Sequence, residues 1–397
     1  METTLDRSLQ TRYFRGFLIA TLAYSVVFAA SATPIPLYSE YKGTIGLTDA
    51  DISVAMATYL LGVLGVLFFA GRISDALGRR ATTGLACVLS AGGCVLFILV
   101  NSVPLLFAAR FCQGLACGIA MSGISAWVVD CAKGKLAVLG NTIAGCGSLF
   151  GIAFGSVAVG FFRSVWSDFN ITYWFIIALL ALTFALLPLT PETVEQRQSL
   201  RVATKPNIGI DPQLRGVFPI AAAAYLSAWC VGAFYQSYCS PIAVDCLNTP
   251  DPIAASIILV LAMVPSALGG PIEARFPSGT SLRLAMVLLL VAAFGSIVAM
   301  VSAAFIPFLA CMALFSVSMG MCLSGSLRLL FAKADGISTA TVTSTINLIA
   351  YTACTVSSFA TSALIPALGL TGIMALLIIL SMLTSSFVFL KTRKTRN

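Results

Sequence analysis

The stretch Gly71-Arg-Ile-Ser-Asp75-Ala-Leu-Gly78-Arg79-Arg80 forms a short charged segment between two long apolar runs. Each flanking run has roughly the twenty residues that a helix needs to cross the ~30 Å hydrocarbon core of a bilayer. Runs of this kind recur along the chain, which is 59% hydrophobic and 10% charged with a mean hydropathy of +0.98. Soluble domains carry about 25% charged residues. The stretch is therefore predicted to be a loop of a membrane-spanning helical protein.

We predict an all-α membrane protein with twelve transmembrane helices. Taken in order, the apolar runs place these helices at roughly 17–38, 52–70, 82–101, 105–127, 137–162, 171–190, 216–239, 253–269, 282–301, 305–327, 339–364 and 371–390. The longest polar segment separates them into two sets of six. The predicted domains are an N-terminal six-helix bundle (1–190), a cytoplasmic linker (191–215) and a C-terminal six-helix bundle (216–397).

The two halves also resemble each other in sequence. Phe17–Tyr24 lines up with Phe218–Tyr225, and the G-x-x-x-S-G pattern of Gly118–Gly123 recurs at Gly320–Gly325. Shared spacing over two distant pairs favours duplication. Parallel repeats of this kind are found in transporters whose halves are related by an axis along the membrane normal.

The positions of the basic residues predict the orientation. Of 23 Lys and Arg residues, Lys42 and Arg163 fall on one predicted side, Arg110 lies inside a span, and the others fall on the opposite side. Positive residues mark the cytoplasmic side. We therefore expect a multi-pass protein of the cytoplasmic (inner) membrane with both termini in the cytoplasm. The net charge of +8 reflects topology, and no nucleic-acid partner is expected because no basic patch interleaved with aromatic residues occurs.

Cysteine and histidine usage excludes several classes of chemistry. Nearly all of the twelve cysteines lie within apolar runs, where Cys behaves as a small hydrophobic residue. Cys239 and Cys246 flank a predicted outside loop, and whether they form a disulfide is left open. Histidine is absent, so neither a metal site nor an imidazole proton relay is expected. Without a phosphate-binding loop or a nucleophile elbow, the chain is predicted to be no enzyme and to need no cofactor.

The charged stretch lies between the second and third predicted helices. It resembles motif A of the major facilitator superfamily, which has the same residue spacing. The resemblance implies two six-helix bundles that rock about a midplane cavity. It also implies a conformational latch formed by Gly71, Asp75, Gly78, Arg79 and Arg80. Glycines permit the tight turn, and Asp75 can cap a helix or pair with an arginine. The alternative is a basic loop that only sets topology. The second-half loop, 270–275, keeps little of the pattern.

Helix 4 carries Arg110-Phe-Cys-Gln113-Gly114-Leu-Ala-Cys-Gly118, similar to motif B of the same family. An arginine at a helix centre costs on the order of 2.5–3.5 kcal/mol on insertion scales and normally faces a cavity or partner. We predict that Arg110 and Gln113 act in coupling or in recognition of substrate charge, with Glu40 and Asp51 as the candidate proton-carrying groups at comparable depth. The alternatives are a structural arginine bonded to carbonyls and two solvated loop acids.

Helix 5 carries a ladder of small residues that includes Gly147, Gly151 and Gly155 and predicts close helix packing. The ladder resembles the exporter motif C of the family, although Ile152 stands where that motif has proline. An ordinary small-residue interface is the alternative.

Polar side chains recur on one face of three helices and are the candidates for a substrate cavity. They are Tyr24 in helix 1, then Tyr225, Trp229 and Gln236 in helix 7, and in helix 11 Ser344, Asn347 and Tyr351, continued by Thr355, Ser358 and Ser362. The alternative is that these hydroxyl groups bond to their own backbone.

These features together predict a secondary active transporter that moves a small organic solute by alternating access, with proton-coupled efflux as the favoured mode. We expect it to work as a monomer. One alternative is an uptake or facilitative metabolite carrier, favoured by the incomplete motif C and by the lack of a carboxylate inside the predicted spans. Another is a non-transporting membrane sensor or scaffold, disfavoured because no soluble domain is appended. The substrate, direction, coupling ion and oligomeric state do not follow from the sequence.

Overall fold

The computed structural model describes residues 2–194, 197–199, 212–333 and 339–394. Every regular element within these ranges is helical, as predicted. Eleven helical spans in the described residues are long and apolar enough to cross a membrane. The last of them, Val342–Thr392, has 51 residues and is broken at Gly369, where φ is 66°. It therefore contains two helices, which accounts for the twelve that the apolar runs predict.

Contacts divide the chain into two compact units. Unit 1 comprises Met1–Pro34 and Thr58–Pro206, and unit 2 comprises Ile35–Ala57 and Asn207–Asn397. The bundles predicted at 1–190 and 216–397 are defined by continuous sequence, whereas the two units are defined by contacts between residues. The predicted boundaries are therefore not tested by this division. The contacts nevertheless group the segment Ile35–Ala57 with the C-terminal helices.

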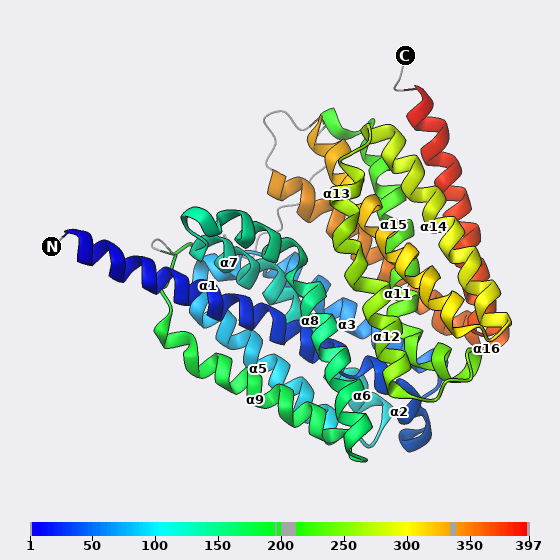
Figure 1. The fold of residues 1–397 in the computed structure, drawn as a ribbon, viewed down its shortest axis with the longest axis horizontal. Coiled ribbons are helices and arrows are strands. Elements are labelled where there is room, and N and C mark those ends of the chain that lie inside the picture. The colour runs from blue at the N-terminus through cyan, green and yellow to red at the C-terminus, as the bar shows by residue number, and fades with distance from the viewer. Residues whose placement is uncertain (1, 195–196, 200–211, 334–338, 395–397) are drawn as a thin grey trace. The chain divides into compact units, whose positions relative to one another are not determined.

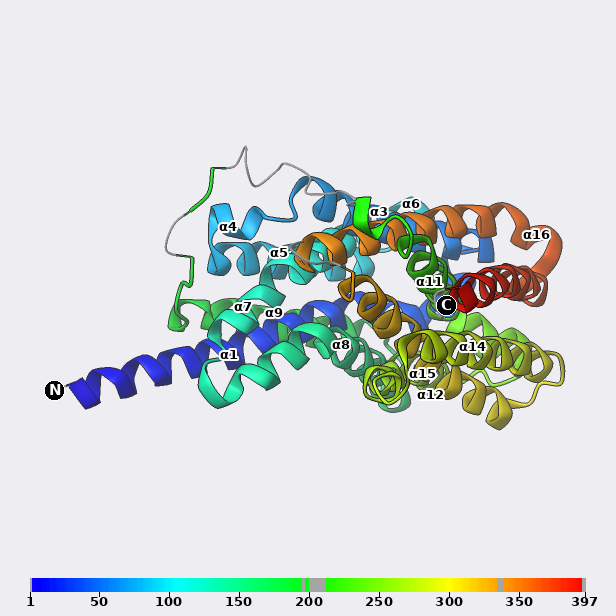
Figure 2. The same ribbon diagram turned by 90° about the horizontal axis from the view of Figure 1, so that it is seen from above.

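Unit 1 is built around α1 (Glu2–Ala32), which packs along α8 (Ala137–Val165) as Figures 1 and 2 both show. A second layer is formed by α5, which packs between α6 and α9. The remaining bounds are α3 Asp49–Phe69, whose first part lies in unit 2, α4 Ile73–Leu77, α5 Arg79–Ile98, α6 Val103–Ile119 with a π-helical continuation Ala120–Ile124, α7 Ser125–Cys131 and α9 Asn170–Leu186.

In unit 2, α11 (Phe218–Pro241) packs against α16 (Thr339–Lys394) and α15 (Phe305–Phe331) (Figure 1). The other helices are α2 Tyr38–Ile45, α12 Pro252–Met263, α13 Gly269–Glu273 and α14 Ser278–Val301. A π-helical segment, Ile242–Cys246, extends α11. All twelve cysteines are free thiols, Cys239 and Cys246 among them.

Helix 1 ends earlier than its apolar run because of two prolines. The run predicts a helix over 17–38 with a bend at Pro34 and Pro36, and α1 ends at Ala32. A 3-10 turn at Ile35–Leu37 follows and leads into α2. Proline has no backbone N–H, so it leaves carbonyl groups of the preceding turn without their helical partner. The predicted bend is confirmed, and the freed carbonyls need other donors.

The outer faces of both units carry large apolar side chains. Val138 is 78% exposed in unit 1, and Val301 and Ile306 are 75% and 71% exposed in unit 2. Soluble monomers seldom expose broad apolar patches. These helices therefore face lipid, in agreement with a multi-pass membrane protein.

Candidate functional site

The charged loop of unit 1 turns at Gly78, between α4 and α5. Gly78 has a φ of 94° and donates its N–H to the Ser74 carbonyl at 3.1 Å. A Cβ at this position would lie 2.7 Å from the Glu192 carboxylate oxygen Oε2. Two reasons therefore require glycine at position 78. L residues avoid this φ, and the Glu192 carboxylate occupies the space that a side chain would need.

Arg79 lies between two carboxylates from different helices. Its Nη1 donates to Asp75 Oδ1 at 3.0 Å, and its Nε donates to Asp130 Oδ2, also at 3.0 Å. Arg79 also bonds to the Ser74 hydroxyl. The Arg79 side chain is 13% exposed, against 30% for Asp75 and 34% for Asp130. The sequence pointed to Asp75 and Arg79 but missed Asp130, whose only signal is its position at the end of the fourth apolar run.

A strap formed by residues 190–194 lies across this loop at the start of the predicted linker. The Glu192 carboxylate accepts the backbone N–H groups of Arg79 at 2.9 Å and Arg80 at 3.2 Å, at the N-terminus of α5. Burial alone raises the pKa of Glu192, but these donors and its own neighbours' N–H groups outweigh burial and lower that pKa.

Two further bonds hold the strap in place. Thr193 donates to Asp130 at 2.8 Å, and the Trp127 indole donates to the Pro191 carbonyl at 3.3 Å. The linker therefore begins with an ordered segment that shares Asp130 with Arg79. Of the remaining linker residues, 195–196 and 200–211 lie outside the described residues.

Arg110 and Gln113 supply donors to the end of α1. Arg110 Nη1 donates to the Ser31 carbonyl at 2.7 Å and to Gln113 Oε1 at 2.9 Å, and Gln113 Nε2 donates to the Ala30 carbonyl at 2.7 Å. The helical partner of the Ala30 carbonyl would be the N–H that Pro34 lacks. The Arg110 guanidinium also lies over the Tyr59 ring, 4.9 Å from its centroid. Motif B thus replaces the hydrogen bonds that the proline break removes.

The glycines of α8 bring its backbone against α1. A Cβ at Gly151 would collide with the Ser25 carbonyl, and one at Gly155 with the Ala29 carbonyl. At Gly147 it would lie 2.9 Å from the Tyr24 ring. Each of these glycines therefore lies where only a glycine permits the approach. Tyr24 is 3% exposed and packs on α8.

Four of the predicted cavity residues lie together in unit 2. Tyr225 donates to Asn347 Oδ1 at 2.5 Å, and the Trp229 and Tyr351 rings have centroids 5.3 Å apart. These pairs join α11 to α16. Gln236 is half-buried further along α11. Ser344 is exposed on α16.

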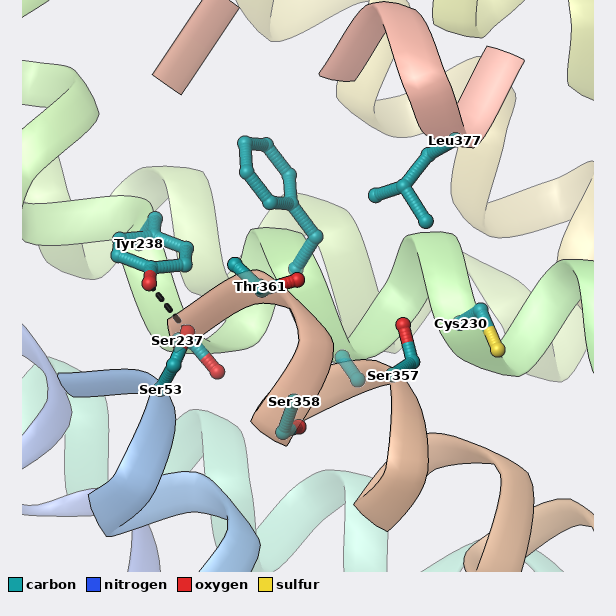
Figure 3. A pocket seen from close by; sticks show the side chains of 10 residues that line it. Ser53, Cys230, Ser237, Tyr238, Ser357, Ser358, Thr361 and Leu377 are labelled. Atoms are coloured by element: carbon teal, nitrogen blue, oxygen red, sulfur yellow. Dashed lines mark hydrogen bonds between the residues drawn. The ribbon is translucent and has the colours of Figure 1, made fainter. Parts of the chain in front are cut away.

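A small cavity in unit 2 is lined by hydroxyl groups, and we call it the hydroxyl pocket (Figure 3). Its volume is about 10 Å³, near the room that one water-sized group needs. None of the ten residues that line it is charged. They are Ser53, Cys230, Ala233, Phe234, Ser237, Tyr238, Ser357, Ser358, Thr361 and Leu377.

Three of these hydroxyl groups make no hydrogen bond to their own helix in the described part of the chain. Elsewhere on α16 the hydroxyls bond to their own helix, as Thr352 does to the Leu348 carbonyl at 2.7 Å. Within the described part of the chain, Ser237, Ser358 and Thr361 have no such bond. They can therefore donate to, or accept from, a bound group. Ser358 belongs to the predicted polar stripe, whereas Ser237 and Thr361 were missed although each directly adjoins a predicted residue, Gln236 and Ser362 respectively.

An apolar groove adjoins the hydroxyl pocket. It has a volume of about 600 Å³, shares Cys230 and Ser357 with the pocket, and is otherwise lined mainly by aliphatic side chains of α11 and α16. A molecule with an apolar body and a small polar group would match the two cavities together.

The candidate proton-carrying acids lie in unit 2, and Arg110 lies in unit 1. Asp51 accepts from the N–H and the hydroxyl of Thr48 at 3.0 and 2.5 Å, as a cap at the start of α3. Glu40 lies in the first turn of α2. Their role in coupling stays a prediction.

The second-half loop holds a buried ion pair that the sequence did not reveal. Arg328 Nη2 lies 2.6 Å from Glu273 Oε1, and the Glu273 side chain is 3% exposed. Arg328 also donates to the Phe276 carbonyl at 2.7 Å. A Cβ at Gly325 would touch Glu273, as one at Gly123 would touch Ser74. The repeated glycines thus occupy equivalent places, with Glu273 where the first half has Ser74.

Comparisons with known proteins agree with this architecture. The sequence profile described as Major Facilitator Superfamily matches residues 20–358. A quinolone resistance protein, NorA of Staphylococcus aureus, is 23% identical over 126 residues, which are 32% of this chain and 30% of that protein. A multidrug resistance protein, MdtL of Shewanella sp. (strain ANA-3), is 32% identical over 79 residues, 20% of each chain. The matched segments span less than a third of these relatives.

The fold is also similar to a solved structure, that of a bacterial homolog to the human lysosomal transporter Spinster in an inward-facing and unoccupied conformation. The TM-score is 0.72 at 14% sequence identity, over 96% of this chain and 97% of that chain. At this identity the likeness concerns the fold alone.

Proposed function

The chain belongs to the major facilitator superfamily, and we propose that it exports a small organic solute across the cytoplasmic membrane by alternating access, coupled to protons. It is a transporter and not an enzyme. The observation that carries the proposal is the position of Arg79, whose side chain lies between Asp75 in α4 and Asp130 in α7, both of them partly exposed. Such a network stabilises one conformer and can be broken when the helices move.

Two similarities support export. One relative is named for quinolone resistance and another for multidrug resistance. The glycines of α8 also lie where only a glycine permits the approach of α1, in the ladder that resembles the exporter motif. Uptake or facilitated diffusion of a metabolite is the alternative. We further propose that both termini are cytoplasmic, that the monomer is the working form and that no nucleic acid is bound.

We propose that the solute is bound in unit 2 by its uncharged polar group. The hydroxyl pocket offers Ser237, Ser358 and Thr361 and no charged side chain, so a neutral polar group of the solute enters it, while any charged group of the same solute stays outside the pocket and keeps its hydration. The groove beside it takes the apolar body. Tyr225, Trp229, Asn347 and Tyr351 form a neighbouring wall of the same two helices.

For coupling, we propose that Arg110 acts through helix 1. Its bonds to the Ser31 carbonyl and to Gln113 tie the broken end of α1 to α6. A carboxylate brought near this arginine would be favoured in its ionised form. Glu40 and Asp51 remain the candidates for that carboxylate, since both follow the break closely in the chain.

The test is transport of a fluorescent quinolone in proteoliposomes, with and without an imposed pH gradient. We expect quinolone to move against its gradient only when protons move in the opposite direction. Transport of quinolone in the same direction as the protons would favour uptake. Equal rates in the presence and absence of the pH gradient would favour a facilitative carrier. Glu40→Gln and Asp51→Asn identify the proton carrier if either one abolishes the dependence on the gradient.

A further inference from the structure

The segment 38–49 is held on the outer end of α11 by polar contacts that we call the outer closure. Lys42 Nζ lies 2.9 Å from Asp49 and 2.8 Å from Asp245. The Ser240 hydroxyl donates to Ser39 Oγ at 2.9 Å and accepts the Ser39 N–H at 3.1 Å. All five residues belong to unit 2.

Tyr238 links the outer closure to the hydroxyl pocket. Its hydroxyl donates to the Asp49 carbonyl at 2.7 Å and contacts the Ser53 hydroxyl. Tyr238 and Ser53 both line the pocket, and Figure 3 shows their bond at its edge. The same tyrosine thus fixes the start of α3 and forms a wall of the cavity.

The order of residues along the helices places the closure outside the pocket. On α11, the pocket residues end at Tyr238, and Ser240 and Asp245 follow. On α3, Asp49 precedes Ser53 by one turn, or about 6 Å at 1.5 Å per residue. Both helices therefore have the closure at the end that the basic residues predict to lie outside, with the pocket one turn deeper.

We propose that the outer closure is the outside gate of the hydroxyl pocket. While Lys42, Ser39 and Tyr238 hold residues 38–53 on α11, the pocket is shut off from the outside. Release of these contacts opens it. The inference rests on the proposed transport for its purpose, but the gate can be tested without a substrate.

The chemistry of the closure suits a contact that must break and form again. The side chains of Lys42, Asp49 and Asp245 are 26%, 31% and 44% exposed. Charged groups that are already partly hydrated lose little free energy when an ion pair is replaced by further hydration. Serine and tyrosine hydroxyls can likewise be rehydrated when the segment moves away.

The first experiment asks whether the closure opens, with Cys230 as a native reporter because its thiol lines the pocket. Cells are treated with a membrane-impermeant cationic methanethiosulfonate, and labelling is mapped by mass spectrometry. We expect the double variant Lys42→Ala/Asp245→Asn to raise labelling of Cys230 roughly three- to tenfold, the population shift that loss of two exposed ion pairs produces.

Asp251→Asn is the matched control, because it removes a carboxylate from the same unit and asparagine still caps α12 at this position. It should leave Cys230 labelling unchanged. An unchanged rate in the double variant, or an equal rise in the control, would overturn the gate.

The second experiment locks the closure. Ser39 Oγ and Ser240 Oγ are 2.9 Å apart, so Ser39→Cys/Ser240→Cys places two sulfur atoms within reach of a disulfide. Oxidation should suppress Cys230 labelling from outside to background, and a reductant should restore it, whereas oxidant should have no such effect on either single variant. Labelling that continues in the fully cross-linked protein would contradict the proposal.

Failure of the gate and failure of the proposed function give different results. If the cross-link blocks Cys230 labelling and quinolone is not transported by the unmodified protein, the gate stands and the proposed substrate class is wrong. If quinolone is transported at the normal rate by the cross-linked protein, the closure is not a gate, while the proposed function stands.

Discussion

The two loops that follow the second helix of each half use charge in opposite ways. In unit 1, Arg79 bridges two carboxylates that are 30% and 34% exposed. In unit 2, Arg328 contacts Glu273, which is 3% exposed. Exposed ion pairs contribute about 0.2–1 kcal/mol, whereas removal of one partner of a buried pair costs about 3–5 kcal/mol. The first loop can change partners cheaply, and the second is suited to hold a fixed structure.

The backbones of the two loops also differ, because the first contains a turn with a positive φ and the described part of the second does not. The first loop turns at a glycine with a φ of 94° and is covered by Glu192 of the strap. In the second, α13 continues directly into the turn 274–276, and no described residue between 264 and 277 has a positive φ. The first loop thus has an arrangement suited to switching, and the second has a buried ion pair in the corresponding place.

The largest effect is expected at the buried pair. Glu273→Leu leaves Arg328 without its carboxylate and should cost about 2–3 kcal/mol, less than a fully buried pair because Arg328 is 35% exposed. The Tm in detergent should fall accordingly. Glu273→Leu/Arg328→Met should recover much of the loss, since both charges are then absent. A single variant as stable as the parent would remove the contrast between the loops.

Next in size is the turn of the first loop. Gly78→Ala places a Cβ at a φ of 94° and against Glu192, and it should cost about 1–2 kcal/mol. The matched control is Gly270→Ala, whose Cβ would meet the Ser324 side chain, with the hydroxyl oxygen at 3.1 Å and Cβ at 3.8 Å. Its Tm should stay near that of the parent. Equal losses in both variants would show that the two turns are equally constrained.

A smaller effect on stability is expected for Arg79→Lys. Lysine keeps the charge but cannot donate to Asp75 and Asp130 in the planar geometry of a guanidinium. We expect a change in stability below about 1 kcal/mol, together with a severalfold loss of quinolone transport. Transport is measured per folded protein in proteoliposomes. Full activity would mean that charge alone suffices and that the geometry of the bridge is irrelevant.

The smallest effect concerns pH and the strap. Because the folded-state pKa of Glu192 is lowered, its stabilising contribution is present above its ordinary pKa and is lost as pH falls through the folded-state value. The protection factors of the Arg79 and Arg80 amides, which correct for the slower intrinsic hydrogen exchange at lower pH, should therefore fall on acidification. Glu192→Gln should show no such pH dependence. The same pH dependence in that variant would assign the effect to another group.

The helices and the turn of the charged loop at 71–80 were predictable because they depend on local patterns. Apolar runs of about twenty residues identify spans, and Pro34 and Pro36 identify the break in helix 1. The spacing of Gly71, Asp75 and Gly78 identifies the loop. Each of these signals lies within a few residues of the feature it predicts.

The partners of these residues were not predictable, because they come from distant parts of the chain. Asp130, which bonds to the Arg79 side chain, is 51 residues away in the sequence. Glu192, which bonds to the Arg79 backbone N–H, is 113 residues away. Similarly, the bonds of Arg110 to helix 1 depend on how two helices are rotated against each other. Apolar composition predicts where helices lie along the chain but leaves their facing sides undetermined. Which hydroxyls face the pocket depends on the same rotations.

The first loop is expected to switch partners during transport, and the second is expected to hold a fixed structure. Tm and quinolone transport per folded protein, measured for Asp75→Asn and Glu273→Leu in the same preparation, distinguish these two roles. We predict that Asp75→Asn keeps a Tm near the parent and loses transport roughly tenfold, the factor given by about 1.4 kcal/mol of lost stabilisation of one conformer. Glu273→Leu should lower Tm and keep transport per folded protein. The reverse pattern, or parallel losses of Tm and transport in both variants, would show that the two loops do not differ in role.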